Sequence, residues 1–150
     1  MKTLPNRTGY RGYICARQSS DRSVPQHIQQ LVMRDYCAKR GMIFLLSATE
    51  YRMPGCTMML DAVMDELDRL QGIVLYSMFL LPTRQDKRLK LYTRVLEKGA
   101  TLHLAAEGIA LTCQTDIARL EDTCLVQEVL AEQTPGIFTY LTEWDQDAGN

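Results

Sequence analysis

The stretch "GIVLYSMFLL", residues 72–81, is a continuous apolar run in the middle of the chain. Such a run is typical of a strand that is buried on both faces of a parallel sheet. It lies between two helical patterns. The first, 56–70, repeats apolar residues at three and four positions, and the second, 82–99, begins at Pro82 and ends at Gly99. This alternation of helix, buried strand and helix predicts an α/β fold.

The same alternation continues toward the N-terminus. Two further apolar runs, "GYICA" (12–16) and "MIFLLSA" (42–48), are predicted strands. The segment between them, 23–41, is a predicted helix with Ser23 as its N-cap and Gly41 as its end. Near-continuous apolar strands separated by helices predict a three-layer domain with a mainly parallel sheet of four to five strands.

The C-terminal part extends this pattern. Residues 100–111 are a predicted fourth strand, 115–144 a predicted helix followed by a short strand, and 145–150 a frayed tail. Because 150 residues fall within the usual size of one domain, we expect a single α/β domain with its core at 9–111.

Composition limits the possible partners and the compartment. Lys plus Arg number 17 and Asp plus Glu 18, so the net charge of −1 gives no global field that favours DNA or an anionic membrane. The five cysteines are widely spaced and contain no C-x-x-C pair, which predicts reduced thiols and no zinc site. Without a signal peptide or a long apolar span, we expect a cytoplasmic protein with neither a DNA nor a membrane partner.

Polar residues that follow the predicted strands form the candidate site. In a parallel α/β sheet, ligands bind beyond the carboxyl ends of the strands, where loops meet helix N-termini. Arginines and hydroxyls dominate here, and a guanidinium binds phosphate in a bidentate way. We therefore expect an anionic ligand such as a phosphorylated or nucleotide-linked sugar. The predicted binding residues are Arg17, Ser19, Ser20, Arg22, Ser47, Tyr51, Arg52, Ser77, Thr83 and Arg84.

Three residues are candidates for catalysis: Ser19 as a nucleophile, and Glu50 with Glu107 as an acid/base pair if their strand ends face one cleft. Structural roles are the alternatives. Ser19 is also a good helix cap, and either glutamate is a plausible ion-pair partner of Arg17. No metal site is predicted, and the sequence identifies no cofactor.

Several motifs resemble the catalytic domain of serine recombinases, the resolvases and invertases. "YICARQSS" (13–20) is similar to its Y-x-R-x-S opening, "RMPGCTMML" (52–60) to its R-P-G-x-x-x-L segment, and "LEKGATLHLAAEGIAL" (96–111) to its later strand ending in E-G-I. The resemblance implies a flavodoxin/resolvase-like fold. It also implies that Ser19 holds the position of the DNA nucleophile.

The third predicted strand departs from that family. Recombinases carry L-D-R-L-x-R there, and its two arginines bind and activate the scissile phosphate; the aligned "MFLLPT" (78–83) has Leu80 and Thr83 instead, with Arg84 shifted by one. Phosphoryl transfer depends on positioned positive charge. The chain also ends without a basic helix-turn-helix or zinc-ribbon module. We therefore do not expect DNA cleavage.

A second resemblance covers about 9–111. "VPQHIQQLVMRDYC", "LLSATEY", "GIVLYSMFLLP" and "KGATLHLAAEGIAL" are similar to strings of the sporadic carbohydrate cluster protein family, which is encoded among bacterial surface-sugar genes. The resemblance implies a setting, the cytoplasmic assembly of lipopolysaccharide-type sugars, and no particular reaction.

Three functional hypotheses follow. The first is an enzyme or enzyme subunit of surface-carbohydrate biosynthesis that binds a phosphorylated or nucleotide-linked sugar. The second is a non-catalytic partner of a sugar-modifying enzyme, and the third is a degenerate serine-recombinase-like domain without DNA cleavage. We also expect a homodimer through the helix 115–133, whose apolar residues exceed what the sheet alone covers. These apolar residues are Ile117, Leu120, Cys124, Leu125, Val129 and Leu130.

Overall fold

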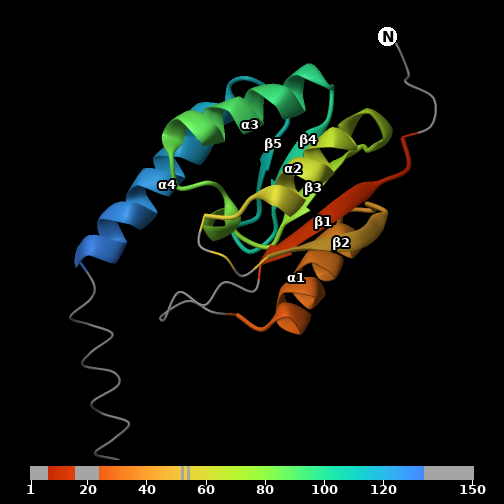
Figure 1. Ribbon diagram of the computed structural model, residues 1–150, viewed down its shortest axis with the longest axis horizontal. Coiled ribbons are helices and arrows are strands. Elements are labelled where there is room, and N and C mark those ends of the chain that lie inside the picture. The colour runs from red at the N-terminus through yellow and green to blue at the C-terminus, as the bar shows by residue number, and fades with distance from the viewer. Residues whose placement is uncertain (1–6, 16–23, 52, 54, 134–150) are drawn as a thin grey trace, which may run out of the picture. The chain divides into compact units, whose positions relative to one another are not determined.

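The computed structural model describes residues 7–15, 24–51, 53 and 55–133 of the chain (Figure 1). Contacts between Cα atoms divide the chain into two units, 1–117 and 118–150. The first unit contains the sheet and three of the four α-helices. The prediction of a single domain over 1–150, with a final strand at 136–144, stays a prediction because residues 134–150 lie outside the described part.

The first unit is built on a five-stranded sheet with the order β2-β1-β3-β4-β5. The first four strands run parallel and β5 pairs antiparallel with β4. The strands are β1 (Tyr10–Cys15), β2 (Phe44–Glu50), β3 (Gly72–Leu75), β4 (Thr101–Leu104) and β5 (Ile109–Leu111). The predicted mainly parallel sheet is confirmed.

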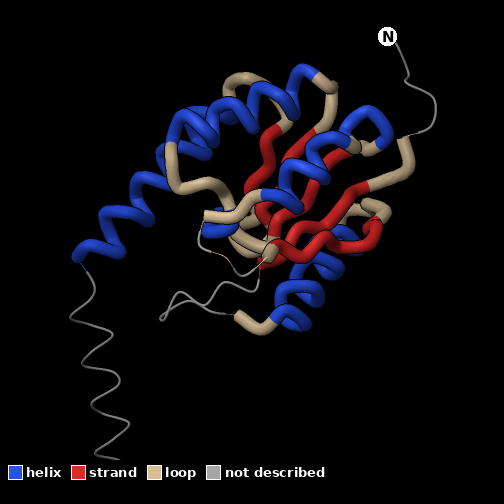
Figure 2. Tube along the Cα trace, in the orientation of Figure 1, coloured by secondary structure: helices blue, strands red, loops and turns tan. Residues whose placement is uncertain are grey.

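Helices cover both faces of this sheet, and Figures 1 and 2 show α1 on one face with α2 and α3 on the other. The α-helices of the first unit are α1 (Gln26–Lys39), α2 (Met58–Asp65) and α3 (Gln85–Glu97). Two 3-10 turns, η1 (Leu67–Arg69) and η2 (Met78–Leu80), follow α2 and β3. The remaining helix, α4 (Asp116–Gln133), begins one residue after its predicted start. None of these helices is both long and apolar enough to cross a bilayer.

Two strand predictions are wrong in extent. The run 72–81 is a strand only to Leu75, after which the chain turns into η2. The run 100–111 is not one strand but the hairpin β4–β5, because residues 105–108 form a turn in which Gly108 has a φ of +67°. A positive φ suits glycine, which has no Cβ to clash with the backbone.

The predicted N-cap of the first helix is also corrected. The helix α1 begins at Gln26, and Pro25 is the residue that precedes it, so Ser23 is not the N-cap. The predicted end is confirmed, because Gly41 follows the helix with a φ of +65°. Proline suits the N-terminal position, since its missing N–H has no partner within a helix there.

The first residue of the central strand, Gly72, has no room for a side chain. Gly72 pairs with Tyr10 of β1 on one side and with Thr101 of β4 on the other. A Cβ added at Gly72 would lie 2.3 Å from the carbonyl oxygen of Thr101. Only glycine therefore fits at this position without moving a neighbouring strand.

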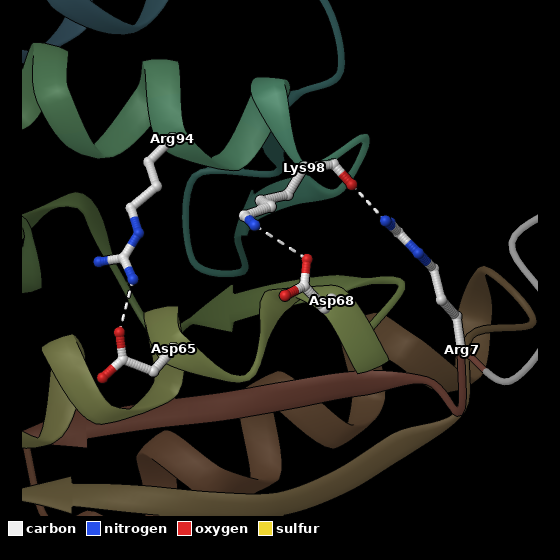
Figure 3. A network of polar contacts seen from close by, with 5 residues as sticks. All are labelled: Arg7, Asp65, Asp68, Arg94 and Lys98. Carbon is white, nitrogen blue, oxygen red and sulfur yellow. Dashed lines mark hydrogen bonds and ion pairs between the residues drawn. The ribbon is translucent and has the colours of Figure 1, made fainter.

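Salt bridges connect α2 and η1 to α3 on the outer side of the fold (Figure 3). The Nη2 of Arg94 lies 2.5 Å from Oδ1 of Asp65, and the Nζ of Lys98 lies 3.0 Å from Oδ1 of Asp68. Arg7 donates to the backbone carbonyl of Lys98. The salt bridges are exposed, so each contributes at most about 1 kcal/mol to stability.

The face under α1 contains a buried polar cluster centred on His103 of β4. His103 is 8% exposed; its Nδ1 lies 2.8 Å from the Tyr36 hydroxyl, and its Nε2 lies 2.9 Å from Oγ1 of Thr101. The guanidinium of Arg40 stacks 3.6 Å from the centre of the Tyr36 ring. Burial, with a smaller effect of the Arg40 charge, lowers the pKa of His103 to about 4. The imidazole is therefore neutral in the folded protein at neutral pH.

The lowered pKa of His103 makes the free energy of unfolding depend on pH. The dependence lies between the pKa of His103 in the unfolded chain, about 6.5, and that in the folded protein, about 4. The unfolded chain binds a proton that the folded chain excludes, so stability is full above this range and is lost as pH falls. Linkage predicts that the free energy of unfolding falls by about 1 kcal/mol from about pH 7 to about pH 5.5. Urea unfolding of the wild type and of His103→Gln at both pH values measures this loss.

The variant should lose this part of the pH dependence, whereas His27→Gln, which changes an exposed histidine of α1, should keep it. A wild-type stability that does not change over this range would contradict a depressed pKa at His103.

Candidate functional site

The carboxyl ends of β1 to β4 meet at one edge of the sheet, because these four strands are parallel. Several of the predicted site residues lie outside the described part of the chain: Arg17, Ser19, Ser20, Arg22 and Arg52. Their predicted roles therefore stay predictions. The described residues at this edge show what surrounds them.

Gln29 links the two residues that flank the segment 16–23. It lies on α1 and is 3% exposed. Its Nε2 donates to the carbonyl oxygens of Cys15, at 3.1 Å, and Val24, at 2.7 Å, and its Oε1 accepts from the Cys15 N–H at 3.4 Å. One buried amide thus holds the end of β1 beside the chain that leads into α1. We did not predict this role from the sequence, although Gln29 occupies the same helical stripe as the buried Met33.

Glu50, the last residue of β2, is a buried anchor for α2. Its carboxylate is 2% exposed and accepts hydrogen bonds from the N–H groups of Met59 and Leu60 at 3.1 Å. The Tyr13 hydroxyl donates to it at 2.8 Å, and the Cys56 thiol donates at 3.3 Å. The negative charge therefore lies at the N-terminus of a helix, where free N–H groups and the helix dipole stabilise it.

The electrostatics agree with this role. Burial raises the pKa of Glu50, but hydrogen bonds from Met59, Tyr13, Leu60 and Cys56 together lower it more, so the pKa lies below its ordinary value. A general acid or base that works near neutral pH needs a raised pKa. Glu50 is therefore an ionised structural carboxylate in this arrangement.

Glu107 occupies a similar position in the turn between β4 and β5. Its carboxylate accepts from the Ser77 hydroxyl at 2.6 Å and from the Met78 N–H at 3.1 Å. The Ser77 hydroxyl in turn accepts from the Phe79 N–H at 3.3 Å. The structure thus brings together two predicted site residues, Ser77 and Glu107, and both are used to begin η2.

The two glutamates are separated by the width of the sheet. Glu50 ends β2 and Glu107 follows β4, and β1 and β3 lie between these strands. Three strand spacings amount to roughly 14 Å. An acid/base pair that acts on one small substrate through one water spans about 6.5–9.5 Å in glycoside hydrolysis. The geometry does not favour Glu50 and Glu107 as partners in one reaction.

The remaining predicted residues are scattered around the edge. Ser47 lies within β2 rather than after it, because the strand extends to Glu50, and its hydroxyl donates to Oε1 of Gln30 at 3.4 Å. Tyr51 is 53% exposed, and Thr83 is also exposed. Arg84 forms a two-point contact with Asp86, Nε to Oδ1 at 3.1 Å and Nη2 to Oδ2 at 3.0 Å.

A buried arginine close to this edge was not predicted from the sequence. Arg88 lies on α3 and is 7% exposed, and its Nη1 donates to the carbonyl oxygens of Thr83 at 2.8 Å and Pro82 at 3.2 Å. It fixes the connection between η2 and α3.

The described residues contain no group of three or more His, Cys, Asp or Glu side chains that could hold a metal ion. All five cysteines lie in the described part and are thiols; Cys15, Cys37 and Cys124 are buried, Cys56 is half-buried and Cys113 is exposed.

The fold that carries this edge is found in known structures. A resolvase-family site-specific recombinase from Streptococcus pneumoniae matches with a TM-score of 0.56 at 11% identity, over 94% of this chain and 99% of that one. The N-terminal catalytic domain of TP901-1 integrase matches with a TM-score of 0.57 at 15% identity, over 82% of this chain and 98% of that one. The chain has the resolvase fold.

At these identities, the similarity covers the fold alone. The sequence matches no protein-family model and no curated protein. The predicted flavodoxin/resolvase-like fold is confirmed, and the distant resemblance to serine recombinases is supported. The resemblance to the sporadic carbohydrate cluster family receives no support from these comparisons.

The role of Glu50 can be tested by stability. Glu50→Ala leaves buried N–H donors of α2 and the Tyr13 hydroxyl without their acceptor, and each unsatisfied buried donor costs about 1–3 kcal/mol. We expect the free energy of unfolding to fall by about 2–4 kcal/mol in chemical denaturation.

Glu97→Ala is the matched control, since this glutamate is exposed on α3, and it should change stability by no more than about 0.5 kcal/mol. If Glu50→Ala is as stable as the wild type, Glu50 does not anchor α2.

Proposed function

We propose that this chain is a serine-recombinase-like domain that does not cleave DNA. The observation that carries the proposal is the composition of the strand-end edge next to η2. Leu80 and Thr83 stand where the resemblance places the two phosphate-activating arginines, and neither carries a charge. The similarity of fold to a resolvase-family recombinase and an integrase catalytic domain supports the first half of the proposal.

The described surroundings do not replace the missing charge. Arg84 is the arginine nearest in sequence, but Asp86 compensates its guanidinium through two hydrogen bonds. The buried Arg88 donates to backbone carbonyl groups of residues 82 and 83. Phosphoryl transfer depends on positive charge positioned around the phosphate oxygens. A serine nucleophile without such charges nearby is therefore not sufficient for DNA strand cleavage.

The surface-carbohydrate hypothesis and its partner variant stay predictions. Their site is the anion cradle of Arg17, Ser19 and Ser20, which lies outside the described residues. Gln29 gives indirect support for a binding site in the segment 16–23, because it hydrogen-bonds to both residues that flank this segment.

The proposal predicts no covalent protein–DNA intermediate. The chain is fused to a sequence-specific DNA-binding domain and supplied with DNA that carries two matching sites, and the reaction is stopped with detergent. We expect no adduct between Ser19 and a DNA 5′-phosphate, because the activating charges are absent.

The catalytic domain of an active resolvase in the same fusion is the positive control, and Ser19→Ala is the negative control. An adduct that forms with the wild-type chain and disappears with Ser19→Ala would overturn the proposal.

Self-association is a separate prediction. In α4, the apolar residues Leu125, Val126, Val129 and Leu130 are 43–56% exposed. Burying such residues against a second copy would remove apolar surface from water at about 25 cal/mol per Å². We expect a homodimer at tens of micromolar by light scattering and a monomer for the double variant Leu125→Ser, Val129→Ser. A wild-type monomer at that concentration would contradict the prediction.

A further inference from the structure

A groove lies between α2 and α3. Its volume is about 350 Å³, which falls at the lower end of the range for small-molecule sites. Residues of α2 and its start form one wall, and residues of α3 with the preceding proline form the other. The lining residues are Thr57, Leu60, Asp61, Met64, Pro82, Lys87, Lys90, Leu91 and Arg94.

The inner part of the groove is apolar. Leu60, Met64 and Leu91 contribute to the lining and are between 2% and 7% exposed, so they form its floor. Pro82 adds a rigid apolar ring at one side. Contact between an apolar floor and a flat or apolar ligand group removes apolar surface from water, which favours binding. The same floor offers no hydrogen bonds to a sugar ring that carries several hydroxyls.

The outer part of the groove carries three cations of α3 and one carboxylate, Asp61 of α2. Lys87, Lys90 and Arg94 are three and four residues apart on α3, so they lie along one side of that helix. Asp65 compensates the charge of Arg94 (Figure 3). Lys87 and Lys90 are exposed, and no carboxylate of the described residues forms a salt bridge with either one.

A hydroxyl completes the polar rim. Thr57 is the N-cap residue of α2, but its side chain makes no capping hydrogen bond. The N–H groups of Met59 and Leu60 are already used by Glu50. The Thr57 hydroxyl therefore remains as a donor and acceptor in the lining, opposite the lysines of α3.

We propose that this groove binds a mononucleotide, with the base on the apolar floor and the phosphate between Lys87 and Lys90. The flat, largely apolar base matches the apolar floor of the groove, and the anionic phosphate matches the lysines at its rim. A sugar phosphate supplies the anion without the apolar group. The proposal does not depend on whether Ser19 cleaves DNA, since neither Ser19 nor residues 80 and 83 belong to the lining.

The charge arrangement favours a small ligand over a polynucleotide. Proteins that bind duplex DNA typically neutralise about 6–10 phosphates. On α3, salt bridges already compensate Arg94 and Lys98, and Arg88 is buried, which leaves two lysines at this groove. Two lysines are enough for one phosphate group and too few for a stable contact with a nucleic-acid backbone.

The test is an NMR titration of the full chain with adenosine 5′-monophosphate, ribose 5-phosphate and inorganic phosphate. We expect the mononucleotide to bind most tightly and to shift the amide signals of residues 57–64 and 82–94. The double variant Lys87→Ala, Lys90→Ala should weaken this binding roughly tenfold or more, because a hydrogen bond to a charged group is lost at each lysine.

Lys39→Ala is the matched control. Lys39 is an exposed helical lysine on α1, which covers the other face of the sheet, and its removal should leave the affinity unchanged.

Three kinds of result would overturn the proposal. The first is a failure of the expected mononucleotide binding: either no binding at millimolar concentration or equal binding by the wild type and the double lysine variant. The second is equal affinity for inorganic phosphate and the mononucleotide, which would show a general anion site without a role for the apolar floor. The third is much tighter binding of a 20-nucleotide DNA strand that is lost in the double lysine variant, which would identify a nucleic-acid surface instead.

Discussion

The hydrogen bonds to the buried carboxylate of Glu50 hold β1, β2 and α2 together. An ionised group inside a protein costs several kcal/mol unless donors surround it. Here the donors come from two elements and a loop: the hydroxyl of Tyr13 in β1, the thiol of Cys56 before α2 and the first N–H groups of α2. Satisfying one charge therefore fixes β1, β2 and α2 relative to one another. It also fixes one wall of the groove that α2 shares with α3.

Glu107 repeats this arrangement after β4, two strands away from β1, with Ser77 and the start of η2 as its donors. The strand-end edge thus uses its acidic side chains to hold helical segments in place. The fold that this chain shares with a site-specific recombinase is here combined with neutral residues at 80 and 83. The fold and the chemistry of its edge are separable, because the fold depends on strand pairing and apolar packing and the chemistry on a few charged side chains.

Periodicity predicted the order and type of nearly every element, since each helix and strand has a local apolar pattern. It failed where a distant residue decides the local structure. The strand at 72–81 stops at Leu75 because Glu107, about 30 residues later, caps the turn at Ser77 and Met78. Gln29 and Arg88 were missed for the same reason: a polar residue in a helical pattern does not show which buried carbonyl group it will meet. Ser47 was placed after its strand because the predicted strand, 42–48, ended two residues before the observed end at Glu50.

The pairing of β1 also decides the order in which the sheet can assemble on the ribosome. Tyr10 pairs with Phe44 of β2, 44 − 10 = 34 residues later, and with Gly72 of β3, 72 − 10 = 62 residues later. At a synthesis rate of about 5–20 residues per second, β3 follows β2 by roughly 1 to 6 s. During that interval, β1 and β2 can pair under α1 while the other edge of β1 stays without its partner. A strand with a partner on each side in the finished sheet is thus one that the nascent chain must keep accessible until β3 arrives.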